Sequence, residues 1–346
     1  MGSVPLADAE AVFRAVSSEL GDLVARIPDG ETGPRDNWVV WQLPLLQEHP
    51  DLETVSSLPE YGPGVRVKVR DGVDPSGVEF GPLGYARAAL ESWPVFARLQ
   101  AEGVIPAHTR FQVSLPTPIA VVAAFTAVHQ TELERAYEAR LLAELAEITA
   151  AVPADRLAVQ WDCAVEFALQ EGVFPAWFGD GAPDRLLAGI VERMVRLGEA
   201  VPTGVPLGYH LCYGDFGHAH FVQPADTTRL AAVANGVAAG LSRPLDWLHL
   251  PVPRDRDDTA YFLPLKDLSL PEGTALYLGL VHATDGIEGG RRRLAAAKEV
   301  VDAFGVATEC GLGRRPAGQL PGLFATHAAL AREAAAGSPA RSSPAP

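Results

Sequence analysis

The sequence of 346 residues has only three cysteines, few basic residues and no long apolar run. Three scattered cysteines cannot form a disulfide framework in a chain of this length, so each is either a buried apolar residue or a chemical group. No apolar stretch approaches the roughly 20 residues that cross a bilayer. The first 21 residues form an amphipathic helical pattern without the basic start and apolar segment of a signal peptide. We therefore expect a cytoplasmic protein.

Positive charge is also scarce. The chain has 28 lysines and arginines against 43 aspartates and glutamates, which gives a formal net charge of -15. Binding to nucleic acid requires a basic face, and so does docking on anionic lipid. We therefore expect neither nucleic acid nor a membrane as a partner. The hydrophobic content of 48% is ample for a large buried core.

Short β-rich runs alternate with helical patterns along the chain. Apolar residues recur every three or four positions over 131–150, and 184–197 and 291–304 are similar. Strands that alternate with helices predict an α/β fold with a parallel sheet, open or closed. We expect the eighth strand within 65–80, where the run 65–69 alternates and could form a hairpin. The seven countable strands are 23–27, 110–115, 157–161, 206–211, 246–250, 275–281 and 305–308.

His210 and Cys212 lie together at the end of one predicted strand. Residues two apart on a strand share a face, so the imidazole and the thiol point the same way. Both groups are good ligands for zinc, and Cys310, at the end of the last strand, could close around the same ion. The alternative is that both cysteines are small core residues and that His210 caps the strand.

Four segments resemble the catalytic barrel of cobalamin-independent methionine synthase, in that family's order. They are His210-Leu-Cys-Tyr-Gly-Asp-Phe216, Glu309-Cys-Gly-Leu-Gly-Arg-Arg315, Val159-Gln-Trp-Asp162 and Leu280-Val-His-Ala283. The resemblance spans about residues 23–330 and extends to the wider superfamily that includes uroporphyrinogen decarboxylase. It implies a single (β/α)8 TIM barrel over residues 1–336. The tail 337–346, rich in serine, proline and alanine, is then expected to be disordered.

The resemblance also implies a chemistry. His210, Cys212 and Cys310 would hold Zn²⁺, which keeps a small thiol substrate as a zinc-bound thiolate. This thiolate attacks a methyl or alkyl carbon, His282 gives a proton to the leaving group, and Asp162 binds a substrate ammonium. The activity implied is that of a zinc-dependent methyl- or alkyltransferase. A folate, a corrinoid protein or a small metabolite would be the donor.

The segments also depart from the family's pattern. Pro251 stands where the family has a further zinc ligand, a glutamate, and His249 lies two residues earlier on the same face and could replace it. The family's Gly-Ser turn after the first strand is replaced by the charged loop 28–35. An open ligand position would also suit a zinc-dependent lyase or hydrolase that acts without a thiol. A non-catalytic zinc protein is the third possibility.

The remaining candidates are polar residues at strand ends. Asp285 could orient His282, and Asp215 belongs to the zinc-motif segment. Each of the others has a plain structural alternative, a capped turn, a solvated helix face or a surface loop. The predicted substrate contacts are Asp29, Glu31, Arg35, Asp215 and Glu166, and the further candidates are His218, His220 and Arg254.

Overall fold

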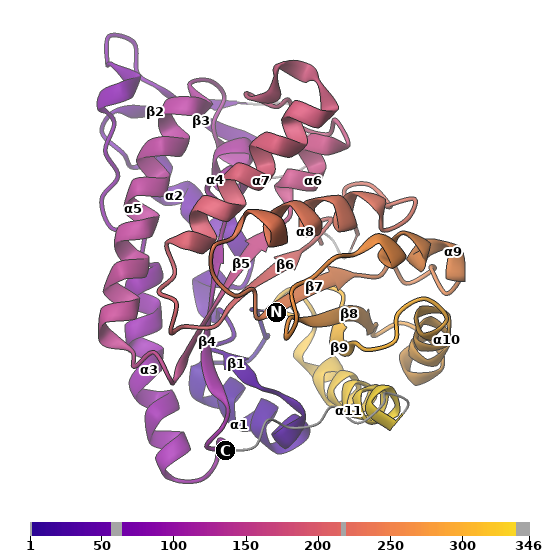
Figure 1. The fold of residues 1–346 in the computed structure, drawn as a ribbon. Coiled ribbons are helices and arrows are strands. Elements are labelled where there is room, and N and C mark those ends of the chain that lie inside the picture. Colours follow the sequence, from indigo (N-terminus) through magenta and orange to yellow (C-terminus); the bar gives the residue numbers. More distant parts are fainter. Residues whose placement is uncertain (1, 57–63, 216–218, 337–346) are drawn as a thin grey trace.

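A computed structural model describes residues 2–56, 64–215 and 219–336 (Figure 1). Seven parallel strands form one curled sheet in the order β1-β4-β5-β6-β7-β8-β9. Each of the seven strands expected from the sequence is present, within a few residues of its expected bounds. They are β1 (Arg26–Pro28), β4 (Arg110–Pro116), β5 (Leu157–Cys163), β6 (Leu207–Leu211), β7 (Trp247–Pro251), β8 (Ala275–Val281) and β9 (Gly305–Thr308).

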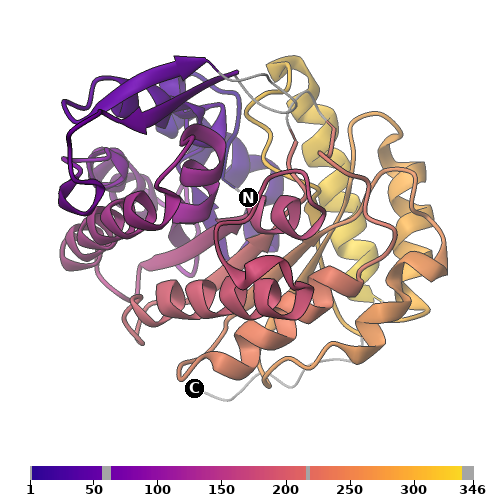
Figure 2. The ribbon, with the colours of Figure 1, turned by 90° about the horizontal axis from the view of Figure 1, so that it is seen from above.

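Helices surround this sheet, as the view from above shows (Figure 2). The helix expected over 131–150 is α5, and the one expected over 291–304 begins and ends earlier, as α10. The helices are α1 (Ala9–Leu20), α2 (Gln42–Gln47), α3 (Tyr85–Ala101), α4 (Pro118–Phe125), α5 (Gln130–Ala151), α6 (Val165–Gln170), α7 (Pro183–Glu199), α8 (Thr228–Gly240), α9 (Thr259–Phe262), α10 (Gly286–Lys298) and α11 (Leu320–Ala336). Within the described ranges, no helix is both long and apolar enough to cross a membrane.

The run 65–69 is not an eighth strand of the parallel sheet. It forms β3 (Val65–Val69), which pairs antiparallel with β2 (Leu52–Ser56) in a separate two-stranded sheet. The eighth strand expected within 65–80 is therefore not found, and the run 65–69 forms a hairpin instead. A complete eight-stranded barrel is not seen in the part of the chain that the structure describes.

The residues before α1 link the two edges of the curled sheet. Ser3 forms a parallel bridge with Gly30, just after β1, and its carbonyl accepts a hydrogen bond from the Leu312 amide at 2.7 Å. The helix expected over the first 21 residues begins only at Ala9, because the Asp8 side chain caps the amide of Ala11. Residues 2–4 are thus extended chain between β1 and the segment after β9.

The central strands β5, β6 and β7 are buried at every position. Such continuous burial is typical of a parallel sheet covered on both faces. Gly208 of β6 faces Trp247 of β7, and a Cβ at this glycine would lie 1.9 Å from the indole. Only glycine permits this contact. The same register aligns Asp162, His210 and His249 in one row across the three strands.

Candidate metal centre and substrate cavity

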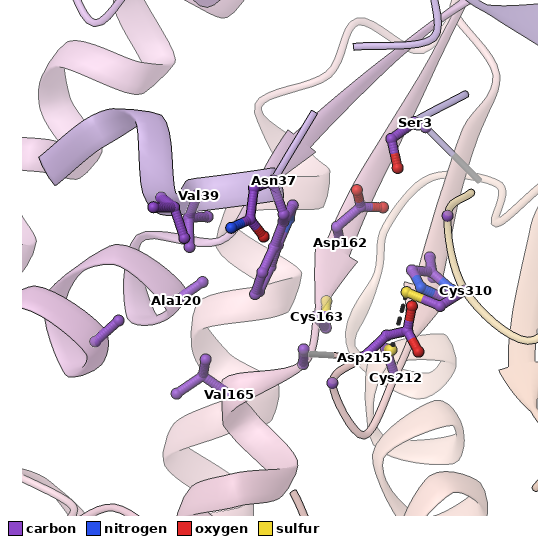
Figure 3. Close-up of a pocket in the computed structure, with 18 of the residues that line it drawn as sticks. Ser3, Asn37, Val39, Ala120, Asp162, Cys163, Val165, Cys212, Asp215 and Cys310 are labelled. Atoms are coloured by element: carbon purple, nitrogen blue, oxygen red, sulfur yellow. Dashed lines mark hydrogen bonds between the residues drawn. The ribbon is translucent and has the colours of Figure 1, made fainter. Parts of the chain in front are cut away.

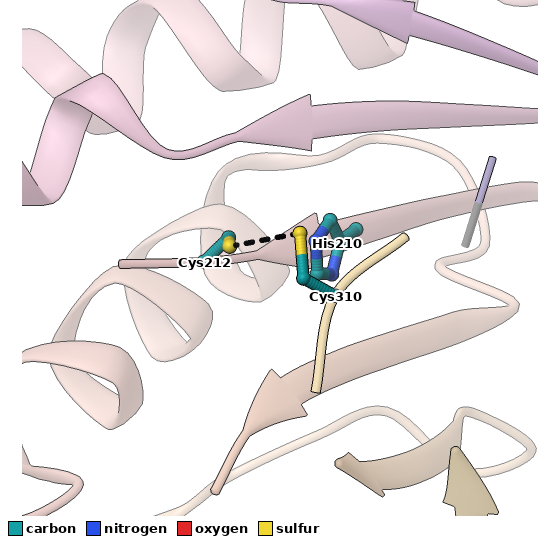
Figure 4. Close-up of side chains that lie close together, drawn as sticks. All are labelled: His210, Cys212 and Cys310. Carbon is teal, nitrogen blue, oxygen red and sulfur yellow. Dashed lines mark hydrogen bonds between the residues drawn. The ribbon is translucent and has the colours of Figure 1, made fainter. Parts of the chain in front are cut away.

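Three potential metal ligands meet at the carboxyl ends of β6 and β9 (Figure 4). His210 lies near the end of β6, Cys212 directly follows that strand, and Cys310 comes two residues after β9. Their ligand atoms all lie within 4.8 Å of one another. The two sulfur atoms are 3.6 Å apart, although 98 residues separate them in the sequence. We call these three residues the metal group.

The metal group fits a zinc ion. Two sulfurs each about 2.3 Å from a tetrahedral zinc would lie about 3.8 Å apart, close to the observed separation. The Cys212 thiol donates a hydrogen bond to Cys310, which holds the pKa of Cys310 well below its usual range. The thiolate is the form that binds metals. In the described part of the chain, His210 Nε2 is buried without a hydrogen-bond partner, so a polar atom is left for an ion.

His249 does not belong to the metal group. It lies behind His210, and the Nδ1 atoms of the two rings are 2.5 Å apart. Burial is the main cause that lowers the pKa of His249 well below its usual value, so this ring is neutral. The contact engages Nδ1 of His210 and leaves Nε2 as the atom that can bind a metal.

One large cavity opens beside the metal group (Figure 3). Its volume is about 990 Å³, which includes the part that is open to solvent. Asp162, Asp215 and the two cysteines line one part of it, and apolar side chains line the opposite part. We call this space the substrate cavity. Its apolar wall comprises Val39, Val40, Ala120, Ala124, Phe125, Val165 and Phe174.

Two carboxylates in the substrate cavity have perturbed acidity. Burial, with the Asp162 charge as the second cause, raises the pKa of Glu31 to about 8. Burial also raises the pKa of Asp162, which accepts a hydrogen bond from Gln160 at 2.8 Å through Oδ1. Gln160 accepts in turn from the indole of Trp247 at 3.2 Å. The Gln160 amide thus fixes one oxygen of Asp162, and no side chain that the structure describes bonds to the other.

The charged loop after β1 contributes one residue to the substrate cavity. Glu31 lines it, whereas Asp29 and Arg35 line a smaller neighbouring space. The Asp29 carboxylate bonds to Arg35 at 2.7 Å, to Ser92 at 3.0 Å and to the Glu31 amide at 2.9 Å. These bonds hold Glu31 at a positive φ of 47°. Asp29 and Arg35 therefore position Glu31.

Asp215 lines the substrate cavity but is also bound to Arg314. The guanidinium donates to the Asp215 carboxylate at 2.8 Å and to its backbone carbonyl at 3.0 Å. Burial raises the pKa of Asp215, and Arg314 opposes this effect. The pair ties the segment after β6 to the segment after β9, the two segments that carry the cysteines.

His282 is not among the residues that line the substrate cavity. Its Nε2 lies 2.8 Å from the Val252 carbonyl, and its Nδ1 lies 3.3 Å from the Glu309 carboxylate. The other oxygen of Glu309 lies 2.8 Å from His220 Nε2. Burial is the main cause that lowers the pKa of His282. Glu309 thus takes the place beside His282 that the sequence suggested for Asp285.

Asp285 binds a buried arginine instead. Arg293, whose side chain is 0% exposed, donates to the two oxygens of Asp285 at 2.7 and 3.0 Å. Glu166 also does not line the substrate cavity, although its neighbour Val165 does. It is fully buried, accepts from Thr117 at 2.5 Å, and burial raises its pKa to about 7. His218 lies outside the described residues.

Several residues of the site carried no signal in the sequence. Ser3, Asn37 and Trp38 line the substrate cavity, and Trp38 has a positive φ of 46°. Such backbone strain in a non-glycine residue is common at functional sites. Glu309 could have been found, because it directly precedes Cys310. Cys163 is outside the metal group and fully buried, and it also lines the substrate cavity.

No protein-family model matches this sequence, and no curated protein is similar to it at a significant level. Solved structures do match. A B12-independent methionine synthase from Shewanella sp. W3-18-1, in complex with selenomethionine, superposes with a TM-score of 0.58 at 15% identity, over 94% of this chain and 87% of that one. A methyltransferase from Methanosarcina mazei gives a TM-score of 0.48 at 12% identity, over 96% and 94%. This chain therefore shares its fold with a B12-independent methionine synthase, the kind of protein that the four sequence segments resemble.

Proposed function

We propose that this protein is a zinc-dependent methyl- or alkyltransferase whose acceptor is a small aminothiol. The observation that carries the proposal is the convergence of the metal group and Asp162 on one cavity. His210, Cys212 and Cys310 would hold the ion. Three protein ligands leave one tetrahedral position for a substrate. A zinc ion bound there would supply Lewis acidity that keeps a thiol ionised at neutral pH.

The residues around the metal group orient it. His249 fixes the ring of His210 through the Nδ1 contact, as outer partners of metal-binding histidines commonly do. Arg314 and Asp215 hold the two cysteine-bearing segments together. We assign His249 this positioning role and not the role of a fourth ligand.

The two carboxylates of the substrate cavity favour a cationic partner. Asp162 is buried and Glu31 is partly buried, and the pKa of each lies above its usual value. The two carboxylates repel each other when both are ionised. An ammonium group placed between them would offset this repulsion and stabilise both ionised forms. We therefore propose that Asp162, supported by Glu31, binds the amino group of the acceptor.

The apolar wall suits the hydrocarbon part of a substrate. Val39, Ala120 and Val165 face the polar part of the substrate cavity (Figure 3). Such a wall excludes water from the site where the sulfur atom attacks the alkyl carbon. As the new S–C bond forms, the bond from carbon to nitrogen or oxygen of the donor breaks. The leaving atom takes a proton from solvent at the open mouth of the substrate cavity, because His282 does not line this cavity and its two ring nitrogens lie against Glu309 and the Val252 carbonyl.

The test is thiol alkylation with a generic donor. Zinc-loaded protein is incubated at pH 7 with methyl iodide and cysteamine, cysteine or homocysteine, and the S-methyl product is measured by mass spectrometry. We expect acceleration over the uncatalysed rate that is lost in Cys310→Ser and kept in Arg332→Met, an exposed position on α11. If no thiol is methylated faster than in buffer, the proposal is wrong. Turnover of a substrate without any thiol would support the lyase or hydrolase alternative.

A further inference from the structure

A second cavity lies beside the substrate cavity, at the carboxyl ends of β6 to β9. It encloses about 650 Å³ and is bounded by His220, Arg254, His282, Glu309 and Arg315. These residues follow four different strands, so the second cavity opens at the same end of the sheet as the metal group. Ligands of parallel α/β folds bind at this end.

A single wall separates the two cavities. It is built from the consecutive pairs 220–221, 309–310 and 314–315, and each pair gives one residue to each cavity. Cys310 lines the substrate cavity, for example, while Glu309 lines the second cavity. The wall therefore places the metal group and His282 on opposite sides.

The carboxylates of the second cavity are already engaged. Glu309 lies between His220 at 2.8 Å and His282 at 3.3 Å. Asp255 accepts from the guanidinium of Arg254 at 2.9 and 3.1 Å. Neither acid is left to neutralise a further cation.

Two basic side chains of the second cavity, in contrast, have groups without a hydrogen-bond partner among the residues that the structure describes. Among the residues that the structure describes, no carboxylate or carbonyl oxygen bonds to the side chain of Arg315. The side chain of His220 is only 3% exposed, and its Nδ1 has no hydrogen-bond partner in that part of the chain. A half-buried guanidinium and a buried imidazole that face the same space form a recognition site for an oxyanion.

We propose that the second cavity binds the carboxylate or phosphate group of a small ligand through Arg315 and His220. The wall separates the second cavity from the site proposed for the aminothiol, so the anion bound there is a further ligand of this protein. The chain carries a net charge of -15, so an anion needs such a local group of donors to bind at all.

Calorimetric titration of the full chain with inorganic phosphate, and separately with glutarate, tests this assignment. We expect saturable binding of at least one probe. Tighter binding of phosphate would specify a phosphorylated ligand, and tighter binding of glutarate a carboxylate ligand. Arg315→Met should weaken the affinity about tenfold or more, since it removes a charged donor. Arg332→Met, an exposed arginine on α11, is the matched control and should leave the affinity unchanged.

Two further variants keep the result interpretable. His220→Asn should weaken binding as well, and serves if Arg315→Met folds poorly by circular dichroism. Cys310→Ser should bind the probes normally, because the oxyanion site does not include the metal group. Loss of thiol alkylation with retained probe binding would therefore separate a failure of the proposed function from a failure of this inference. The inference is overturned if neither probe binds, or if Arg315→Met and Arg332→Met behave alike.

Discussion

His249 stands directly behind His210, with 2.5 Å between their Nδ1 atoms. The two residues are register partners on β6 and β7, so the sheet itself sets their contact. When the neutral ring of His249 accepts the Nδ1 proton of His210, the resulting tautomer of His210 has a free lone pair on Nε2. The nitrogen that we propose as a metal ligand thus follows from the pairing of two strands.

Replacing His249 by alanine should weaken zinc binding without removing it. The variant loses the partner that fixes the ring of His210, and such outer partners are worth about 10- to 100-fold in metal affinity. Competition with a chromophoric chelator measures the change. His327→Ala is the control, because His327 is a half-buried histidine whose Nε2 lies 2.9 Å from the Val306 carbonyl on another part of the sheet. Equal zinc affinity in the wild type and His249→Ala would contradict the positioning role.

Asp162→Asn should raise KM for aminothiols. A hydrogen-bonded charge pair is worth about 1.5–3 kcal/mol, so KM for cysteamine should rise about tenfold to a hundredfold. KM for 2-mercaptoethanol, which has no amino group, should change little. The exposed Asp71→Asn provides the control. If both thiols respond equally, Asp162 does not recognise the ammonium.

Glu166 should make the protein less stable as the pH rises. Its pKa is about 7 in the folded chain against an ordinary value of 4.5, so the folded state holds a proton that the unfolded state has already lost. The free energy of unfolding should fall between these two pH values, by about 3 kcal/mol at most. Glu166→Gln should remove the contribution of Glu166 to this fall, as urea unfolding at pH 5 and pH 8 would show, whereas the contribution of Glu31, whose pKa is about 8, should stay. Exposed Glu19→Gln should retain the whole fall, and a wild type equally stable at both pH values would refute the assignment.

Asp285→Asn should lower the stability of the protein more than it lowers the rate of thiol alkylation. The variant leaves the fully buried Arg293 without its carboxylate, a loss worth about 3–5 kcal/mol. The double variant Asp285→Asn/Arg293→Met should recover part of it in thermal unfolding. Unchanged stability with lost alkylation would instead restore the catalytic role that the sequence suggested for Asp285.

Local patterns predicted the elements of this fold well. The seven parallel strands and α5 follow from apolar periodicity, which is a property of neighbouring residues. Two members of the metal group could also be predicted, because His210 and Cys212 share a strand face by simple alternation. The run 65–69 was ambiguous, since alternation is the same in a hairpin and in a barrel strand.

Long-range choices between partners could not be predicted. Asp285 had two possible neighbours, His282 and Arg293, and only the packing of α10 against β8 selects the arginine. Ser3 lies 309 positions before Leu312, and no periodicity connects them. Consecutive residues such as Glu309 and Cys310 line different cavities. This division depends on how loops that follow different strands pack together, and it leaves no local pattern in the sequence.

Metal content tests the central claim most directly. Inductively coupled plasma mass spectrometry of the wild type, Cys310→Ser and the buried control Cys163→Ser gives the zinc bound per chain. We predict about one zinc in the wild type and in Cys163→Ser, and loss of the metal in Cys310→Ser. Wild-type protein that is folded yet stays free of zinc after incubation with the ion would contradict the account.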